Sequence, residues 1–323
     1  MKKFSNINQQ INILKSRGMK FNNVSFAKDI LRHISYYNII NAFKDLFTLK
    51  DALNETYIAN LTFEEVYDIY LFDKDLRHLF LKYILQIETE LRTHVAYVFG
   101  KNEGPYQYFD INSFDLKHSD YVIKMIESIS SNINKQYKDT RDDMIGHFAK
   151  LNEQLPIWVL VNTFDFGLLK TFFLNMKVEQ KKEIASIYSL SVKSYNSFLQ
   201  TLHMFRNVCA HDYRILFYRI HDSNKKIVDT NIHKNLNIIK DTNNNYLYGK
   251  SDLYSLIIIF KYLLSEESFK EFFNELINLI DILKKGLISI DINNIYKSIG
   301  FPTKYNNQLD FKEIININLN KWL

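Results

Sequence analysis

The longest regular pattern of apolar residues lies in the first third of the chain and has the period of an α-helix. Thr62 and Glu65 form a capping-box pattern, in which each side chain can accept a hydrogen bond from the other's backbone amide. The pattern holds until Gly100, a residue type that commonly ends helices. It predicts a helix over 62–100, roughly 55 Å long at about 1.5 Å per residue. The apolar stripe consists of Phe63, Val66, Ile69, Tyr70, Leu76, Leu79, Phe80, Tyr83, Ile84, Ile87, Leu91, Val95 and Val98.

Shorter patterns of the same period predict helices along most of the remaining chain. Pro156 fits the first turn of one of them, and Gly104 with Pro105 marks a connection. The stretch 222–250 is rich in Asn and Lys with short apolar alternations, which favours a long surface excursion with room for a small hairpin. The other helices are expected at about 5–17, 25–47, 119–150, 156–176, 178–188, 192–219, 252–264, 266–285 and 291–298.

The low content of turn-forming residues supports an all-α fold. The chain has 8 Gly and 3 Pro among 323 residues, and turn-rich β architectures need more of both. No internal repeat and no low-complexity linker divides it. We therefore expect one compact helical unit, with an N-terminal helical segment over 1–58, a helical core over 59–285 and a C-terminal segment over 286–323.

Composition and charge set only broad limits on function. Hydrophobic residues make up 46% and charged residues 24%, which is typical of a globular protein. The net charge of +5 is compatible with an anionic partner, but a dedicated nucleic-acid coat would carry a denser basic face. One cysteine excludes an intramolecular disulfide framework and fits a reducing compartment. The N-terminus has no signal-peptide core and the longest apolar stretch is too short to span a bilayer, so we expect a soluble cytoplasmic protein without a membrane partner.

Histidines and carboxylates are the remaining source of chemistry, because the sequence has no Gly-rich phosphate loop, paired-Cys zinc pattern, HExxH or GxSxG. Most of the nine histidines stand singly. The exception is the segment 202–214, LHMFRNVCAHDYR, in which His203, Asn207 and His211 follow at four-residue steps and fall on one stripe of a helix. Its apolar neighbours predict that the segment packs into the core, where unpartnered polar groups cost about 1–3 kcal/mol each. A cleft lined by these groups and Arg206 would explain their presence.

Three other interpretations of this segment are open on these residues alone. Arg206, Asn207 and His211 can form a buried network that only stabilises the bundle. A metal site of His203, Asn207 and His211 has suitable spacing but lacks a carboxylate or Cys as third ligand in line. Cys209 stands between Val and Ala, which is typical of a small apolar core residue.

Two acid–arginine pairs with four-residue spacing lie in the long predicted helix. Glu88 with Arg92 is by default a surface ion pair, and Asp73 with Arg77 is interpreted as structural. Neither pair points to a site by its spacing alone.

The segment 206–211, Arg-Asn-Val-Cys-Ala-His, resembles the RNxxAH version of the Arg-x4-6-His motif of the HEPN ribonuclease superfamily. Its surroundings resemble the Abi-like family of phage abortive-infection proteins (AbiD/AbiF type) over nearly the whole chain. The order of the matching stretches is more specific than the short motif, which Arg141 with His147 and Arg214 with His221 also satisfy. The matching stretches are 10–18, Tyr36-Tyr37, Phe72-Asp73, Leu76-Arg77, Ile87-Glu88, Leu91-Arg92, Pro156-Ile157-Trp158, Phe166-Gly167 and Gly300-Phe301-Pro302.

This resemblance implies an HEPN-like helical bundle that cleaves RNA without a metal or other cofactor. It implies Arg206 and His211 as catalytic residues with Asn207 beside them. RNA would be the substrate or a partner, a homodimer the working form, and a phage-encoded component the trigger. The alternative is a non-catalytic RNA-binding or phage-sensing protein built on the same bundle. Further candidates for the second shell or the cleft are His203, Asp212, Arg214, Glu88 and Arg92.

Overall fold

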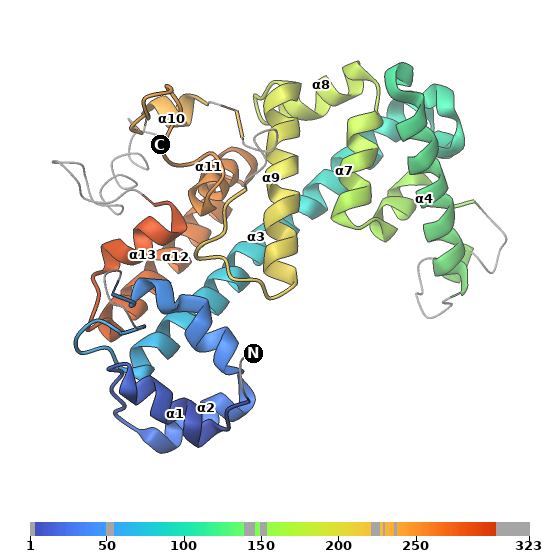
Figure 1. The fold of residues 1–323 in the computed structure, drawn as a ribbon. Helices are drawn as coiled ribbons and strands as arrows, with labels where there is room; N and C mark the ends of the chain where they lie inside the picture. Colours follow the sequence, from blue (N-terminus) through green and yellow to red (C-terminus); the bar gives the residue numbers. More distant parts are fainter. Residues whose placement is uncertain are drawn as a thin grey trace.

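The computed structural model describes residues 4–49, 55–138, 146–148, 154–220, 227–228, 230–235 and 238–301. A single helix of 41 residues, α3 (Phe63–Glu103), runs diagonally through this part of the molecule and contacts helices on several sides (Figure 1). The described residues contain helices and three isolated bridges but no strand, so the expected all-α fold is confirmed. Among the described helices, none combines the length and the apolar character needed to cross a membrane.

Both ends of α3 differ in detail from the prediction. Thr62 caps the helix by accepting from the amide of Glu65, but the Glu65 carboxylate accepts from the amides of Ile288 and Ser289 instead of completing a capping box. The last helical residue is Glu103 and Gly104 is the C-cap, so the helix continues past Gly100. Gly100 stays helical at a close contact, since a Cβ there would lie 3.2 Å from Cγ2 of Ile157.

The N-terminal segment lies at the start of α3 (Figure 1). The helix predicted over 25–47 is wrong in its second half, because Ile34 takes an extended backbone and ends α2. A five-residue π-helix follows and turns Ile39 and Ile40 into the core. The elements here are α1 (Ile7–Ser16), α2 (Val24–His33), the π-helix η1 (Tyr37–Asn41) and the 3₁₀ turn η2 (Lys44–Leu46).

The middle of the chain packs against the second half of α3. The helix predicted over 156–176 is interrupted at Phe164, and Asp165 then caps a new helix by accepting from the amide of Leu168. The helix predicted over 192–219 ends early, at Ala210. The elements are the 3₁₀ turns η3 (Gln107–Phe109), η4 (Ile111–Ser113), η5 (Leu116–His118) and η6 (Val161–Thr163), with α4 (Ser119–Lys138), α6 (Ile157–Leu160), α7 (Phe166–Asn175), α8 (Val178–Ile187) and α9 (Val192–Ala210).

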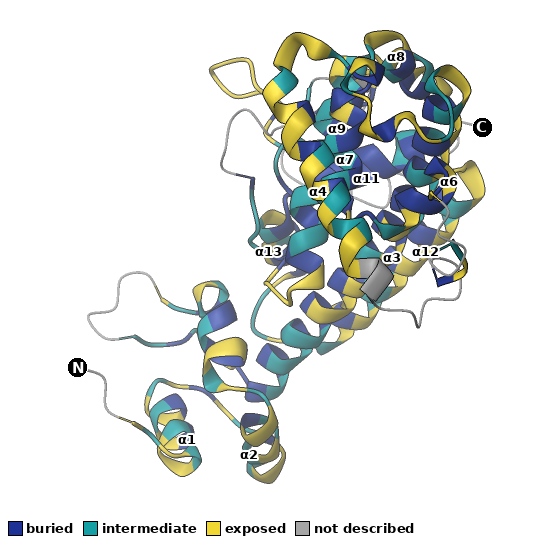
Figure 2. Cartoon of the chain, turned by 90° about the vertical axis from the view of Figure 1, so that its right-hand side faces the viewer, coloured by how far each residue is buried: buried dark blue, intermediate teal, exposed yellow. Residues whose placement is uncertain are grey.

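The C-terminal helices cover the first half of α3, with α12 lying along it (Figure 1). Phe80, Tyr83, Phe260 and Phe272 form an aromatic cluster at this contact. In the predicted excursion, a bridge between Lys240 and Tyr246 makes a minimal hairpin without strands. The elements are α10 (Asn231–Asn235), α11 (Leu253–Leu263), α12 (Glu266–Gly286) and α13 (Ile292–Ile299). Buried apolar side chains from Ile11 to Phe301 form one connected core, and burial continues along α3 (Figure 2).

Candidate functional site

The segment that carries the candidate motif is the C-terminal end of α9 and the turn after it. His211 is the C-cap residue, exposed, and its amide donates to the carbonyl of Asn207 over 3.0 Å. Asp212 has a φ of +58°, and the amide of Tyr213 reaches back to the carbonyl of Val208 over 3.2 Å. This is a Schellman-type helix end with Asp where glycine is usual. The chain therefore leaves the helix directly after His211, whose amide still makes the last helical hydrogen bond.

Arg206 points from α9 toward a buried carboxylate on α3. Its Nε lies 3.9 Å from Oε2 of Glu88, which is 2% exposed. The other oxygen of Glu88 accepts from Arg92, whose guanidinium also donates to the carbonyl of Phe164 over 3.0 Å. Glu88 is thus the shared partner of two arginines and not half of a surface ion pair, which corrects the interpretation of Glu88 with Arg92.

The same three side chains are incompletely hydrogen-bonded. Oε2 of Glu88, Nε of Arg92 and Nε of Arg206 are buried atoms without a hydrogen-bond partner in the described part of the chain. The side chain of Arg206 keeps 27% of its surface exposed. A guanidinium that lies beside a buried carboxylate and keeps part of its side chain exposed can bind an anionic oxygen pair.

His203 and Asn207 lie beside this cluster, where α9 meets α7. Nδ2 of Asn207 is 3.4 Å from Nε2 of His203, as their four-residue spacing predicts. The His203 ring stacks on Phe166, and its Nδ1 is 3.2 Å from Nζ of Lys170. A Cβ at Gly167 would lie 3.4 Å from Nε2 of His203, so the start of α7 lies close to this edge of the imidazole.

The second acid–arginine pair of α3 fastens the turn that follows His211. Arg77 is 4% exposed and forms ion pairs with both Asp73 and Asp212. The other oxygen of Asp73 accepts from the amides of Ile215 and Leu216 over 3.0 and 2.9 Å. Burial raises the pKa of Asp73 to about 6, although these two hydrogen bonds and the charge of Arg77 act in the opposite direction. The contact of Arg77 with Asp212 joins residues far apart in the sequence, so spacing gave no sign of it.

Two further candidates have structural surroundings. The guanidinium of Arg214 donates to the carbonyl of Ala42 and ties the turn to the N-terminal segment. Cys209 is buried, and burial raises the pKa of its thiol to about 12. A thiol with so high a pKa is a poor nucleophile, which agrees with its interpretation as a core residue.

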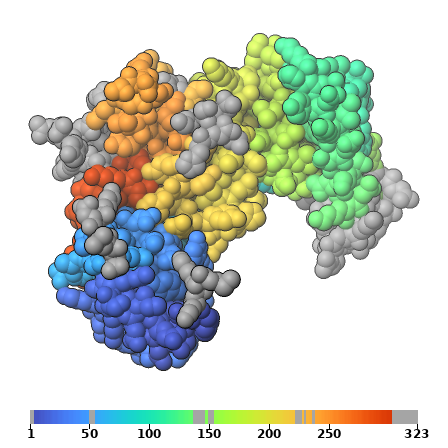
Figure 3. Space-filling model, in the orientation of Figure 1, coloured from blue at the N-terminus to red at the C-terminus, as the bar shows by residue number. Residues whose placement is uncertain are grey.

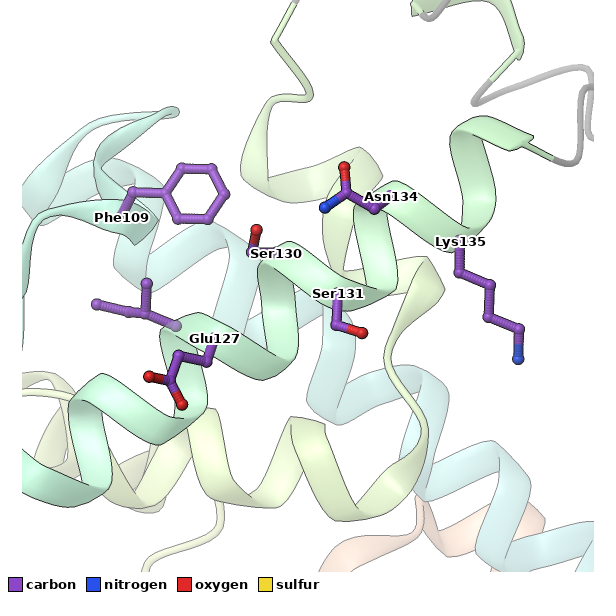
Figure 4. Close-up of a pocket in the computed structure, with 7 residues that line it drawn as sticks. Phe109, Glu127, Ser130, Ser131, Asn134 and Lys135 are labelled. Carbon is purple, nitrogen blue, oxygen red and sulfur yellow. The ribbon is translucent and has the colours of Figure 1, made fainter.

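Two surface hollows border α4, away from the motif. One lies between η3 and α4, with Glu127 and Lys135 toward opposite ends of its row of side chains (Figure 4). The other is a groove of about 1050 Å³ between α4 and α7, which reaches Asp165 and Gly167 near His203. In Figure 3 the surface recedes between the yellow helix α9 and the green helix α4. The second hollow therefore gives solvent a way toward the His203 side of the cluster.

The structure thus gathers Glu88, Arg92 and Arg206 in one cluster, with His203 and Asn207 on its flank. His211 stands at the helix end beyond them, and no hydrogen bond joins it to Arg206 within the described residues. Of the chance matches to the short motif, His147 is exposed, while Arg141 and His221 lie outside the described residues. No group of three His, Cys, Asp or Glu side chains in the described ranges could hold a metal ion.

The fold and the site together define a class of protein: all-α, with an Arg-Asn-x-x-x-His segment at the end of a core helix. Residues 29–217, more than half of the chain, match the family of Abi-like proteins. The chain belongs to this family, and membership points to a role in abortive infection. The match runs from α2 to Phe217 and includes both acid–arginine pairs of α3 and the whole turn after α9. No curated protein and no solved structure matches the chain.

Proposed function

We propose that this protein is a metal-independent endoribonuclease of the HEPN type that acts in abortive infection, with Arg206 and His211 as catalytic residues. The observation that carries the proposal is the position of Arg206, whose side chain is 27% exposed and whose Nε lies 3.9 Å from the buried carboxylate of Glu88 without a hydrogen bond. A buried carboxylate can orient a partly exposed arginine, and an oriented guanidinium is suited to bind phosphate oxygens. The exposed imidazole of His211 lies five residues further along the same segment.

The reaction uses the ribose 2′-OH of the RNA as the nucleophile. A base removes its proton, O2′ attacks the adjacent phosphorus, and the bond from phosphorus to the 5′-oxygen breaks. An acid protonates that oxygen, so the products carry a 2′,3′-cyclic phosphate and a 5′-hydroxyl. Histidine suits both proton transfers because its ordinary pKa is about 6.5. Arg206 stabilises the charge that builds on the phosphorane oxygens.

Asn207 and His203 take a supporting part in this proposal. The side-chain amide of Asn207 faces His203 and can donate to a phosphate oxygen beside the Arg206 fork. His203 is held by Phe166 and Lys170, which favours a role in placing Asn207 over a proton transfer of its own.

We further propose that the working form is a homodimer. One imidazole in each motif cannot be acid and base for the same bond cleavage, whereas a two-fold axis near the end of α9 would bring two together. The exposed His211 and its exposed neighbour Tyr213 are accessible to a second copy. A fully active species that sedimented as a monomer at the assay concentration would contradict this part.

The purified protein and a labelled RNA test the activity directly. Cleavage should persist in EDTA, because no metal takes part, and the fragments should carry cyclic phosphate and 5′-hydroxyl ends. Cleavage that EDTA abolished and a divalent ion restored would assign a metal-assisted mechanism instead. Binding of RNA without any cleavage, under conditions where the protein is toxic to its host, would favour the non-catalytic alternative.

A further inference from the structure

Asp73 and Arg77 bind the turn that follows His211, and the geometry points to a function for them beyond stabilising the packing of α3 against α9. We propose that both are positioning residues for His211, acting through Asp212 and through the backbone of residues 215 and 216. The proposal rests on the proposed function only where it predicts an effect on RNA cleavage. The fastening itself can be measured without any reaction.

Arg77 makes the connection to the residue next to His211. Its guanidinium is buried on α3 and pairs with Asp73 on one side and with Asp212 on the other. The Asp212 side chain is 76% exposed, so its carboxylate meets the arginine at the surface end of the pair. A forked guanidinium that binds two carboxylates fixes distance and direction together. The position of Asp212 is therefore set by a helix that precedes it by 135 residues.

Asp73 holds the chain on the far side of the turn. A single oxygen, Oδ1, accepts from two consecutive amides, those of Ile215 and Leu216. Both residues are fully buried, so the chain re-enters the core at this point. Together the two side chains of α3 hold both ends of the turn that follows His211, at Asp212 and at residues 215 and 216.

The turn needs such a fastening because its backbone is not favourable by itself. A non-glycine residue at positive φ costs free energy, and Asp212 takes the place that glycine commonly fills. The last turn of a helix frays unless its end is capped and held. A buried ion pair is also a poor source of stability, since apolar residues of similar volume often do as well. Geometric control of the turn accounts for a charge pair at this site where stability alone does not.

The test is Asp212→Asn, with Asp29→Asn as the matched control. Asparagine keeps the size of the side chain and tolerates positive φ, but loses the charge that Arg77 binds. Because Asp212 is largely exposed, the variant should fold. Asp29 forms an exposed ion pair with Arg32 at the N-terminal helices, so its variant removes an aspartate–arginine pair remote from the turn.

Three measurements are made on the full-length proteins: amide hydrogen exchange of the segment 212–217, alkylation of Cys209, and RNA cleavage. In Asp212→Asn we expect exchange and alkylation to be about tenfold faster, since the turn opens locally. We expect kcat to fall by about 10- to 100-fold with KM unchanged, since a displaced catalytic group affects the reaction and not binding. The control should match the wild type in all three.

Exchange and alkylation rates equal to those of the control would overturn the proposal. So would a fall in kcat with unchanged exchange, because Asp212 would then act directly on the reaction and not through the turn. Absence of cleavage by the wild-type protein would contradict the proposed function alone, because exchange and alkylation need no substrate.

Discussion

The two acid–arginine pairs of α3 have the same spacing in the sequence but are completed differently in the fold. In the first pair, Asp73 also accepts hydrogen bonds from two backbone amides, and Arg77 also forms an ion pair with Asp212. Glu88 with Arg92 retains buried atoms without hydrogen-bond partners in the described residues, and it faces the partly exposed Arg206. Within the described residues, the first pair (the closed pair) is hydrogen-bonded on both sides, while the second (the open pair) retains polar atoms without a partner.

This difference shows why hydrogen-bond completion is a better guide to a site than the presence of charge. Buried polar groups in folded proteins are nearly always satisfied, so a set of unsatisfied ones needs an explanation. At the Glu88 pair, the proposed contact of Arg206 with an RNA phosphate would be accompanied by a small shift that brings its Nε from 3.9 Å to hydrogen-bond distance of Oε2 of Glu88. At the Asp73 pair no ligand is needed.

Substitution of the arginine in each pair should give the largest difference between the two pairs, in the free energy of unfolding. Arg77→Ala leaves Asp73 buried without a counter-charge and should lower the free energy of unfolding by about 3–5 kcal/mol. Arg92→Ala should cost about 1–3 kcal/mol, because its side chain is 21% exposed and Arg206 stays near Glu88. Urea unfolding measures both. Equal losses would contradict the distinction between a closed and an open pair.

Neutralising the acid of the open pair should affect activity more than stability. Glu88→Gln removes the charge that orients Arg206, so cleavage should fall by about tenfold, while the free energy of unfolding changes by about 1 kcal/mol. Glu179→Gln, in an exposed pair with Lys182, is the control and should behave as the wild type. Cleavage by Glu88→Gln at the wild-type rate would remove Glu88 from the site.

The acid of the closed pair should give stability a dependence on pH. Burial raises the pKa of Asp73 from 3.8 to about 6, so between these values the folded protein binds more protons than the unfolded chain. The contribution of Asp73 to stability therefore falls as pH rises from about 4 to about 6. Relative to Asp73→Asn, the wild type should lose about 1 kcal/mol between pH 5 and pH 7. Urea unfolding at the two pH values checks this, and a gain over that range would reverse the sign.

Substitution of a histidine that belongs to neither pair should have the smallest effect on stability and on cleavage. His147 is exposed and matches the short motif by chance, so His147→Ala should change stability by less than about 0.5 kcal/mol and leave cleavage at the wild-type rate. A large loss of cleavage in this variant would place the site elsewhere.

Much of the fold could be predicted because local signals agree with the packing. The apolar stripe gave α3 with the correct first residues, since Thr62 caps it and the stripe faces the core. The breaks at Ile34 and Phe164 carry no Gly or Pro, and the polar residues that follow them, Ser35 and Asp165, also occur inside helices, so they are weak local signals. There the backbone follows tertiary packing, as in the π-helix that buries Ile39 and Ile40.

Only those contacts of the candidate site that lie within one helix could be predicted from the sequence. The four-residue spacing predicted that His203 and Asn207 are neighbours, and their side chains do meet. The early end of α9 was missed because the residue at positive φ is Asp212 and not glycine, and because the arginine that holds it lies on a distant helix. The burial of Glu88 between two arginines was missed for the same reason, since the second arginine, Arg206, comes from another helix.

The most direct test of the central claim compares RNA cleavage by the wild type, His211→Ala and Arg206→Ala at equal melting temperature. The account predicts that each substitution lowers the cleavage rate by about 10²–10⁴-fold while circular dichroism and thermal unfolding stay as in the wild type. A variant that loses both fold and cleavage would be replaced by His211→Gln or Arg206→Lys for the same comparison. Wild-type cleavage rates and unchanged host toxicity in both folded variants would contradict the catalytic assignment.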